Sequence, residues 1–541
     1  MKYHPLDLRS IIATVVTLIG ALTAITAAAQ RTSPIPRVHL PAGPVSSELA
    51  LARTPVAPYG WDLQDKRGTP FEKVDRCVQT SMRAAGIPGA SVAIIDNGVS
   101  VYERGYGVKH RDQGGAVTPD TVFRFGSTLK MMTATAVMQQ VERGRVDLQA
   151  PITQYVPEFQ VGGQWPSSSI VVWNLLTHTT GFPDRYDQFM FRNGLAGPTG
   201  PTALSDWAAG QSAIPLYAPP GSFWNYANPN FSLAALVAQR ASGVEYHQYM
   251  KDNVFGPAGM TSATLLPADV MAYGNYAYEH YVDMFTGQDV IAAPDAYDNW
   301  VMAPAGLGFA TARDLARFAL ILMQGGSPVL SPSSAEMMQA PQVEMQTGEP
   351  MQYGFGVMVL DDYFGSSFRM HGGNVFGSSS SLIWAPDHKF AISLLFNGAA
   401  SPDDAAFCAY NVFHPLSGPP PANTSLPPSE WGKYAGDYRG RFYGHWQWKT
   451  GGEIITYDGL EITGEAVKTG DRLMLRIPQL TVRDNSLTAI GLDNFLAAKL
   501  GVLLPITTVG FLEDPVTQIQ SNFIANRSFV MIREAAPASG R

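Results

Sequence analysis

Cysteine and charge are both scarce in this chain. Its 541 residues include only two cysteines, and Asp, Glu, Lys and Arg together make up 15% of them. No Cys/His set has metal-ligand spacing and no H-E-x-x-H motif occurs, so the sequence predicts no metal and no other cofactor. The net charge is -8 and no Lys/Arg cluster is present. These features exclude nucleic acid as an expected partner.

Apolar residues, glycine and proline are plentiful instead. The composition is 45% hydrophobic, with 52 Gly and 40 Pro. A chain of this length and composition can bury a large core, and its loops should be numerous. We therefore expect a globular protein of two or more units rather than a disordered one.

The amino terminus has the pattern of an export signal. Lys2 and Arg9 supply positive charge, residues 11–26 are apolar, and Ala27-Ala28-Ala29 offers a cleavage site. This pattern predicts that residues 1–29 are a signal peptide that is removed, with an uncleaved membrane anchor as the alternative. Residues 30–70 are rich in proline and lack apolar periodicity, which predicts an extended segment.

Residues 71–415 carry the pattern of an α+β domain. Asp96-Asn97-Gly98 separates two apolar runs and is typical of a tight hairpin turn. Helices are predicted over 71–85 and 403–413, and strands over 91–95, 99–106, 379–384 and 390–397. Strands at both ends with helices between them predict an antiparallel sheet built from the two ends of the domain, with a helical region inserted.

A proline-rich segment separates this domain from the rest. Residues 416–429 contain five prolines, which predicts a linker. Residues 430–536 consist mainly of short Tyr, Phe, Ile, Leu and Val runs broken by Gly and Asp. That pattern predicts a small C-terminal β domain, barrel-like in type.

The two cysteines, Cys77 and Cys408, lie in the predicted first and last helices of the main domain. In an exported chain they can form one disulfide. Two buried free thiols are an equal alternative at this stage.

Ser127 and Lys130 form the first candidate catalytic pair. If a helix begins at Ser127, its hydroxyl and the Lys130 ammonium lie one turn apart on the same face. A serine is a weak nucleophile unless a neighbour takes its proton, so this spacing suits a nucleophile beside its base. Residues 131–140 are apolar nearly all round, which predicts a buried helix. The alternative is a helix-capping serine with a lysine that reaches water.

Two further motifs follow in the chain. Tyr226-Ala227-Asn228 comes after a Pro-Pro-Gly turn, and His371-Gly372-Gly373 precedes Asn374. Alone, the first is typical of a turn and the second of a strand edge marked by glycine. Their order and spacing after Ser127 and Lys130, which form an S-x-x-K motif, indicate that the three motifs belong to one site.

With these three motifs the chain resembles the serine β-lactamase and penicillin-binding protein superfamily. The resemblance is to its class C-like branch, which includes family VIII esterases, D-aminopeptidases and DD-carboxypeptidases. It covers roughly residues 71–415, with supporting stretches at 141–144, 175–181, 308–314 and 353–356. The resemblance implies a β-lactamase/transpeptidase-like fold, in which an antiparallel sheet is flanked by helices and an α-helical lobe borders the site.

The resemblance also implies a role for each motif residue. Ser127 would be the acylated nucleophile and Lys130 its proton acceptor. Tyr226 would pass the proton to the leaving group, and Asn228 would orient the lysine or the substrate amide. The lysine and the tyrosine would act as a coupled pair.

The third motif would supply the substrate-binding strand. The backbone N–H groups of Ser127 and Asn374 would form an oxyanion hole. Gly372 and Gly373 would let substrate approach the strand edge without a Cβ in the way.

The third motif also departs from the antibiotic-hydrolysing members of this superfamily. Those carry Lys-Thr-Gly, whose lysine helps hold a substrate carboxylate. This chain has His371 in place of that lysine, followed by Gly372 in place of the threonine. A histidine is mostly neutral at pH 7, although Arg369 on the same strand could substitute. This difference favours substrates other than β-lactams.

The sequence therefore predicts an exported serine hydrolase. Its substrates would be small esters, amides or D-amino-acid peptides, and the C-terminal domain would provide any association with the cell wall. The alternatives are a penicillin-binding or sensor protein that acylates without efficient turnover, and a true β-lactamase.

Overall fold

The computed structural model describes most of the predicted domain and the strands that follow it. The described residues are 68–184, 196–216, 218–282, 288–345, 351–375, 377–419, 426–442, 447–450, 453–456, 460–478, 485–491, 494–497, 507–512, 523–526 and 529–534. The predicted signal peptide and nearly all of the proline-rich extension lie outside them. Within the described residues, no helix has the length and apolarity needed to cross a membrane.

A nine-stranded antiparallel sheet forms the centre of the domain, in the order β3-β2-β1-β13-β12-β11-β10-β9-β8. The two ends of the domain meet where β1 pairs with β13, with Ala90 opposite Phe396. This arrangement confirms the predicted fold class. The strands are β1 (Gly89–Asp96), β2 (Val99–His110), β3 (Gly114–Ala116), β8 (Val343–Glu344), β9 (Met351–Tyr353), β10 (Met358–Tyr363), β11 (Ser366–Val375), β12 (Ser378–Ala385) and β13 (Phe390–Phe396).

Local sequence explains the first hairpin of this sheet. Asn97 has φ 51° and Gly98 has φ 78°, the left-handed conformations that a tight Asn-Gly turn requires. β1, the strand before the turn, is buried at every position but its last, because helices cover both of its faces. β2, the strand after it, is mostly exposed or half-buried.

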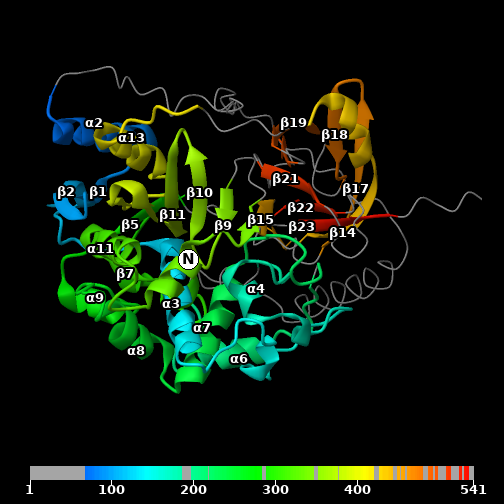
Figure 1. Cartoon of the computed structure of the whole chain (residues 1–541), viewed down its shortest axis with the longest axis horizontal. Helices are drawn as coiled ribbons and strands as arrows, with labels where there is room; N and C mark the ends of the chain where they lie inside the picture. The colour runs from blue at the N-terminus through cyan, green and yellow to red at the C-terminus, as the bar shows by residue number, and fades with distance from the viewer. Residues whose placement is uncertain are drawn as a thin grey trace, which may run out of the picture. The chain divides into compact units, whose positions relative to one another are not determined.

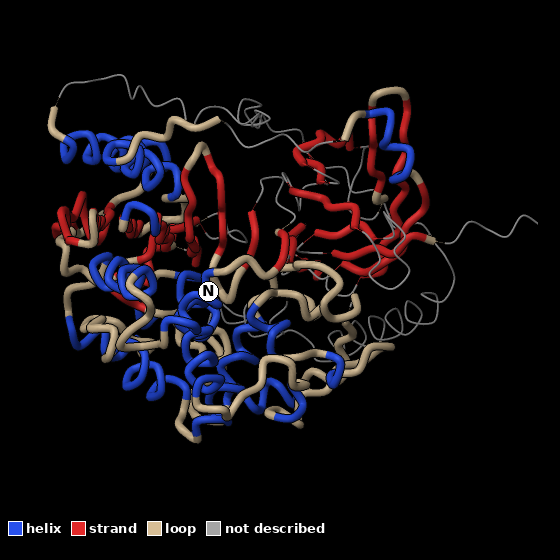
Figure 2. The backbone as a smooth tube through the Cα atoms, in the orientation of Figure 1, coloured by secondary structure: helices blue, strands red, loops and turns tan. Residues whose placement is uncertain are grey.

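Two helices cover one face of the sheet and a third covers the other. α2 (Pro70–Ala85) and α13 (Asp403–Phe413) lie side by side, joined by a disulfide between Cys77 and Cys408 (Figure 1). The disulfide alternative is therefore the correct one. α11 (Ala312–Met323) packs on the opposite face, and Figure 2 shows the strands between these helical layers.

The first turn of α2 is specified by a capping box. Thr69 accepts from the Glu72 N–H, the Glu72 carboxylate accepts from the Thr69 N–H, and Gly86 ends the helix with φ 66°. The buried face of α2 includes Val74 and Val78, which pack with β1, β13 and α13.

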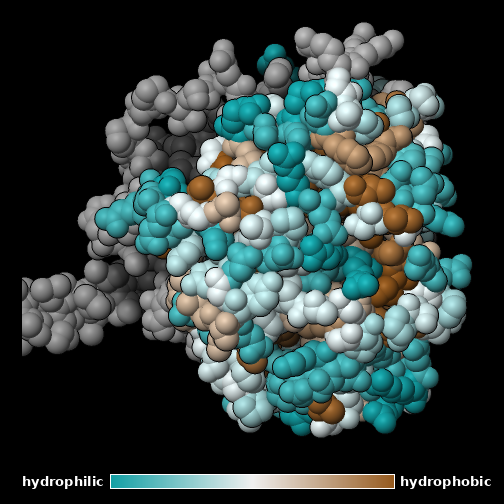
Figure 3. All heavy atoms as spheres, turned by 90° about the vertical axis from the view of Figure 1, so that its left-hand side faces the viewer, coloured by the Kyte–Doolittle hydropathy of each residue, from teal (hydrophilic) through white to brown (hydrophobic). Residues whose placement is uncertain are grey.

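Figure 3, which views the molecule from the left-hand side of Figure 1, shows a mostly hydrophilic surface with separate apolar areas.

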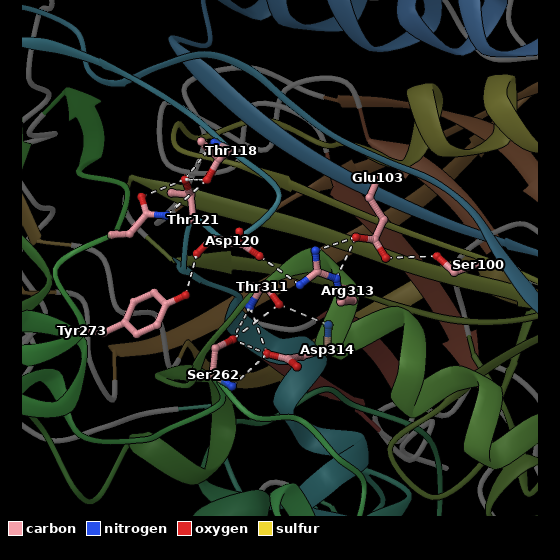
Figure 4. A network of polar contacts seen from close by, with 11 residues as sticks. Ser100, Glu103, Thr118, Asp120, Thr121, Ser262, Tyr273, Thr311, Arg313 and Asp314 are labelled. Atoms are coloured by element: carbon pink, nitrogen blue, oxygen red, sulfur yellow. Dashed lines mark hydrogen bonds and ion pairs between the residues drawn. The ribbon is translucent and has the colours of Figure 1, made fainter.

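α11 begins in a polar network that ties it to the sheet (Figure 4). Asp314 and Thr311 form its capping box, and Ser262 donates to the Asp314 carboxylate. Arg313 donates to Glu103 of β2 at 2.7 Å and to Asp120 at 2.9 Å. The start of α11 is thereby held against both β2 and the segment that leads to the candidate nucleophile.

The inserted region is largely helical and contains most of the hydrophobic core. α3 and α7 pack against each other at its centre. Its elements are α3 (Leu129–Glu142), α4 (Val172–Leu176), α6 (Ala203–Ala209), α7 (Pro229–Ser242), α8 (Tyr246–Met250), α9 (Pro267–Tyr273), α10 (Ala303–Gly306), α12 (Pro332–Gln339) and the short strands β4 (Phe123–Arg124), β5 (Glu279–Val282), β6 (Asp289–Ala292) and β7 (Phe309–Ala310).

The C-terminal part contains a closed antiparallel barrel. Its strands are β14 (Gly436–Phe442), β17 (Leu460–Thr469), β18 (Arg472–Arg476), β19 (Asn485–Gly491), β20 (Asn494–Ala497), β21 (Thr507–Leu512), β22 (Phe523–Asn526) and β23 (Phe529–Arg533), with β15 (Gln447–Thr450) and β16 (Glu453–Thr456) as a separate pair. Closure leaves none of these described strands as an unpaired edge of the barrel. The linker at 416–429 and the exact domain boundaries stay predictions.

Candidate active site

Ser127 lies in a single 3-10 turn, Gly126–Thr128, between β4 and α3. The α-helix itself begins at Leu129 rather than at Ser127, so the predicted start was two residues early. Side-chain hydrogen bonds tie this turn to the sheet, including one of 2.7 Å between the Thr128 and Ser380 hydroxyls. Thr128 donates to the His371 carbonyl at 3.1 Å, and Ser380 donates to the Phe125 carbonyl at 2.6 Å.

Lys130, in the first turn of α3, points at the Ser127 hydroxyl. Its Nζ lies 3.0 Å from Ser127 Oγ, 2.7 Å from Asn228 Oδ1 and 2.6 Å from the Ala305 carbonyl oxygen. The lysine is fully buried, so it does not reach water as the alternative interpretation requires. The face of the Tyr226 ring lies 4.8 Å from Nζ, within cation–π range.

The geometry around Nζ limits what Lys130 can do. A protonated lysine has three donors, whereas a neutral one has two donors and a lone pair. The Asn228 Oδ1 and Ala305 carbonyl oxygens can only accept. In the neutral amine, the two N–H groups therefore go to these oxygens, and the lone pair is left for the Ser127 hydroxyl proton.

Asp184 holds Asn228 in position, which the sequence reasoning missed. Asp184 Oδ1 accepts from the Asn228 backbone N–H at 2.8 Å and from its Nδ2 at 3.2 Å. The second bond fixes the amide orientation, because it keeps Nδ2 on Asp184 and turns Oδ1 toward Lys130. Asp184 is 2% exposed. No local sequence motif could have predicted this role, because Asp184 lies 44 residues from Asn228 in the chain.

Glycines bring the Ser127 turn and β11 into backbone contact. Gly126 has φ 60°, and a Cβ there would lie 2.6 Å from the Asn374 nitrogen. A Cβ on Gly373 would lie 2.1 Å from the Phe125 carbonyl oxygen. Only glycine permits this approach. This close approach places the Asn374 N–H beside Gly126, the residue before Ser127. An oxyanion hole made by the Ser127 and Asn374 N–H groups requires such proximity.

His371 is buried in a neutral form. Desolvation first, and then the nearby Lys130 charge, lower its pKa to about 3, although a bond to the Gly372 carbonyl opposes the shift. Nδ1 lies 2.6 Å from that carbonyl, so Nδ1 carries the proton. Nε2 lies 3.0 Å from the Tyr353 hydroxyl and accepts from it. Burial also keeps Tyr353 protonated by raising its pKa well above the usual value.

Arg369 does not replace the missing lysine of the third motif. Its Nη1 donates to Asp361 at 2.7 Å and to the Phe368 carbonyl at 2.9 Å. Arg369 is also outside the set of described residues that line the cavity beside Ser127. The suggestion that Arg369 could hold a substrate carboxylate therefore has no support in this geometry.

A cavity of about 600 Å³ lies beside Ser127. Seven of the eight predicted site residues line it, and the eighth, Lys130, contacts Ser127. The structure thus brings all of them together. The described lining residues are Ser127, Trp224, Asn225, Tyr226, Asn228, Met302, Ala305, Gly306, Leu307, Met345, Met358, His371, Gly372, Gly373, Asn374, Val375, Ser380, Ala400, Ser401, Pro402 and Asp403.

The lining is apolar or neutral apart from one side chain. Asp403 is the only Asp, Glu, Lys or Arg among the described lining residues. The sequence reasoning placed Asp403 only in a helix and assigned it no role. Across the part of the chain that the structure describes, no group of three or more His, Cys, Asp or Glu residues could hold a metal ion.

Comparison with known proteins identifies the same region. The family model described as Beta-lactamase matches residues 74–416. Penicillin-binding protein 4 of Amycolatopsis lactamdurans is 27% identical over 328 residues, which are 58% of this chain and 82% of that protein. A protein of Aspergillus campestris described as an unguisins hydrolase is 25% identical over 316 residues, covering 57% of this chain and 58% of that one.

Solved structures show the fold. The crystal structure of SurE aligns with a TM-score of 0.62 at 22% identity, covering 86% of this chain and 99% of that chain. At this identity the likeness is evidence of fold only. Together with the family match, it places the Ser127 cavity in a known architecture.

Proposed function

The chain belongs to the Beta-lactamase family, and on that premise we propose that it hydrolyses small esters or amides through an acyl-enzyme on Ser127. The observation that carries the proposal is the 3.0 Å contact between Lys130 Nζ and Ser127 Oγ, together with two acceptor oxygens that direct the amine lone pair to the serine. A serine with a base at this distance is the arrangement that nucleophilic acyl transfer needs.

Acylation follows from this arrangement. The Ser127 oxygen attacks the substrate carbonyl carbon as its proton moves to the Lys130 amine. The N–H groups of Ser127 and Asn374 stabilise the oxyanion, a contribution typically worth ~10²- to 10³-fold in kcat per donor. When the oxyanion collapses, the bond to the leaving group breaks and that group takes up a proton by way of Tyr226. Water then attacks the acyl-enzyme ester and gives a proton to the Lys130 and Tyr226 pair. As the bond between the acyl group and the Ser127 oxygen breaks, this pair passes the proton to Ser127 and the acid product is released.

The cavity favours neutral or cationic substrates over carboxylate-bearing β-lactams. His371 is uncharged at neutral pH, and no lysine or arginine is among the described lining residues. A carboxylate bound here would be desolvated without a cationic partner. This supports esters, amides or D-amino-acid peptides as the substrate class.

We also propose export, with removal of residues 1–29. The Cys77–Cys408 disulfide supports it, because structural disulfides are rare in the cytosol. Association with the cell wall through the C-terminal barrel is a further proposal, supported by the similarity to penicillin-binding proteins.

Time-resolved intact mass spectrometry tests the proposed chemistry. The purified protein is mixed in parallel with an activated ester, a cephalosporin and a D-Ala-D-Ala peptide. A transient adduct on Ser127 with continuing product release supports the hydrolase. A permanent adduct would instead indicate an acylating sensor, and efficient cephalosporin turnover would indicate a β-lactamase.

Two serine variants complete this test. Ser127→Ala should lose both the adduct and turnover. Ser169→Ala, at an exposed serine outside the cavity, should keep both. Ester hydrolysis that persists in purified Ser127→Ala would show that the nucleophile is a different residue.

A further inference from the structure

His178 holds the loop that carries Tyr226 on both sides of that tyrosine. Its backbone carbonyl accepts from the Asn225 N–H at 2.8 Å, and its ring Nδ1 accepts from the Ala227 N–H at 3.2 Å. The His178 and Tyr226 rings are in contact, with their centroids 4.3 Å apart and their planes at 36°. One fully buried residue therefore contacts Tyr226 and bonds both of its neighbours in the chain.

The hydrogen bonds of His178 specify one neutral form of its ring. Nδ1 also lies 3.2 Å from Asn230 Nδ2, and Asn230 Oδ1 accepts from the Thr180 hydroxyl at 2.8 Å. The bond to Thr180 orients the amide, so that an N–H of Asn230 faces Nδ1. An atom that accepts from two N–H groups carries no proton, which places the ring proton on Nε2. A protonated ring would direct its own N–H at both donors, so this geometry requires a neutral His178.

His178 is itself fixed by its backbone and by neighbouring rings. Its φ is 56°, in the left-handed region that histidine seldom adopts, just after α4. Residues held in such a conformation cluster at functional sites. Its ring also contacts the Phe231 and Tyr353 rings, with a centroid distance of 5.1 Å to each. A glycine would adopt this φ more easily, but it would leave the Ala227 N–H without its acceptor.

His178 acts on Tyr226 rather than on substrate. It is not among the described residues that line the Ser127 cavity, whereas Tyr226 is. The face of the Tyr226 ring lies 4.8 Å from Lys130 Nζ. A tyrosine that passes a proton between the lysine and a substrate must be held within hydrogen-bond reach of both. The bonds and the ring contact from His178 limit how far Tyr226 can move from that position.

We propose that His178 is a positioning residue for proton transfer to the leaving group, because it fixes Tyr226 beside Lys130. The inference rests on the proposed function, in which Tyr226 passes a proton to the leaving group. This help matters most when the leaving group is a strong base. A p-nitrophenolate departs without a proton, whereas an alkoxide must be protonated as it leaves. Loss of the positioning should therefore depend on the leaving group, which a general loss of structure would not.

Two esters of one acid test this role in the full-length protein. p-Nitrophenyl butyrate releases a stable anion, whereas methyl butyrate needs a proton on its leaving oxygen. His178→Phe keeps a ring beside Tyr226 and removes the acceptor. We expect it to lower kcat/KM for the methyl ester about 100-fold, the lower end of what general acid catalysis contributes, and kcat/KM for the p-nitrophenyl ester by less than about fivefold.

Three further variants interpret the ratio of the two kcat/KM values. Tyr226→Phe should show the same selective loss, because it removes the proton carrier. His178→Asn should restore the methyl ester to within about tenfold of wild type, since asparagine tolerates the left-handed φ and offers Oδ1 as an acceptor. His280→Phe is the matched control, because His280 is also buried, accepts the Arg111 N–H at 3.0 Å and is not among the described lining residues. It should leave the ratio at its wild-type value.

Thermal unfolding checks that each variant folds. If His178→Phe does not fold, Asn230→Asp takes its place. The carboxylate introduced there accepts from the ring and draws its proton to Nδ1, which removes the acceptor for the Ala227 N–H. The same selective loss of methyl-ester hydrolysis is then expected.

The outcomes separate this inference from the proposed function. A selective loss in Tyr226→Phe with none in His178→Phe, or in Asn230→Asp where that variant is used, overturns the positioning role and leaves the hydrolase standing. Equal losses for the two esters, or no recovery in His178→Asn, also overturn it, as does a ratio in His280→Phe that changes as much. A wild-type ratio in Tyr226→Phe would overturn proton transfer by Tyr226, and this inference with it. No Ser127-dependent hydrolysis of either ester would overturn the proposed function itself.

Discussion

Burial determines the charge state of His371, at the scale of a single residue. The histidine occupies the place of a cationic lysine in related antibiotic-hydrolysing proteins, yet both of its ring nitrogens are already bonded in the neutral form. The sequence indicates neutrality only from the ordinary pKa of histidine. The structure adds the reason that neutrality persists in acid, since the ring is 1% exposed and faces Lys130.

The pH dependence of stability should show this burial. The folded pKa of His371 is about 3, below the ordinary value of 6.5 that applies to the unfolded chain. Between these values the unfolded state binds the extra proton, so stability falls as pH falls from about 6.5 toward about 3. At pH 4 the cost is on the order of 3 kcal/mol, and denaturant unfolding should show His371→Gln losing less stability than wild type between pH 7 and pH 4. Equal losses would contradict the assignment.

We expect Asp184 to position the Asn228 side chain. Asp184→Asn can still accept one bond but no longer holds the Asn228 amide by charge, so the amide can turn its nitrogen toward Lys130. We expect kcat for a neutral ester to fall about 10- to 100-fold with KM nearly unchanged, because the loss affects the base rather than substrate binding. Asp206→Asn, at an exposed aspartate, is the matched control. An unchanged kcat in Asp184→Asn would remove this positioning role.

Site residues differ in how readily a sequence reveals them. Ser127 and Lys130 are one turn apart, so local helix geometry alone brings them together. Asp184 contacts Asn228, and His178 contacts Tyr226. Both contacts depend on the tertiary arrangement of segments that no short spacing connects. Spacing rules therefore find the reacting pair and miss the groups that orient it.

At the scale of elements, helix and strand positions follow from local signals. The helix over 403–413 and the Asn-Gly hairpin lie where the sequence predicts them, because apolar periodicity and turn chemistry act within a few residues. The buried ion pair between Arg124 of β4 and Glu279 of β5 has no such signal. Its atoms lie 2.7 Å apart, both side chains are almost fully buried, and the two residues are 155 positions apart.

The junction between the Ser127 turn and β11 should depend on Gly126. Gly126→Ala would place a Cβ 2.6 Å from the Asn374 nitrogen, so the turn and the strand must separate. We expect acylation to slow by at least about 100-fold, the effect of losing an oxyanion donor. Gly144→Ala is the control, since Gly144 has φ 66° but open space around its Cβ position. It should cost about 1 kcal/mol of stability and leave acylation intact. Similar acylation rates in the two variants would rule out this close contact.

At the scale of the whole molecule, the domain is closed by its own ends. α2 and α13 are its first and last predicted helices, and they lie side by side over the sheet in which β1 pairs with β13. Cysteine positions alone left a disulfide and two free thiols equally open, because the sequence does not say whether two helices are neighbours. Their packing on the same face of the sheet decides it, with the two Cα atoms 5.9 Å apart.

This disulfide should stabilise the domain mainly by restricting the unfolded chain. It spans 331 residues, so its reduction frees a very long loop, and removal of native disulfides typically costs ~2–5 kcal/mol. We expect the Cys77→Ser/Cys408→Ser double variant to unfold at a lower denaturant concentration than wild type, with ester hydrolysis near wild type under native conditions because neither cysteine lines the cavity. Dithiothreitol should lower the midpoint of the wild-type protein and leave that of the double variant unchanged. A midpoint that is the same in oxidised wild type and the double variant would mean that α2 and α13 are held by packing alone and that the disulfide adds nothing to stability.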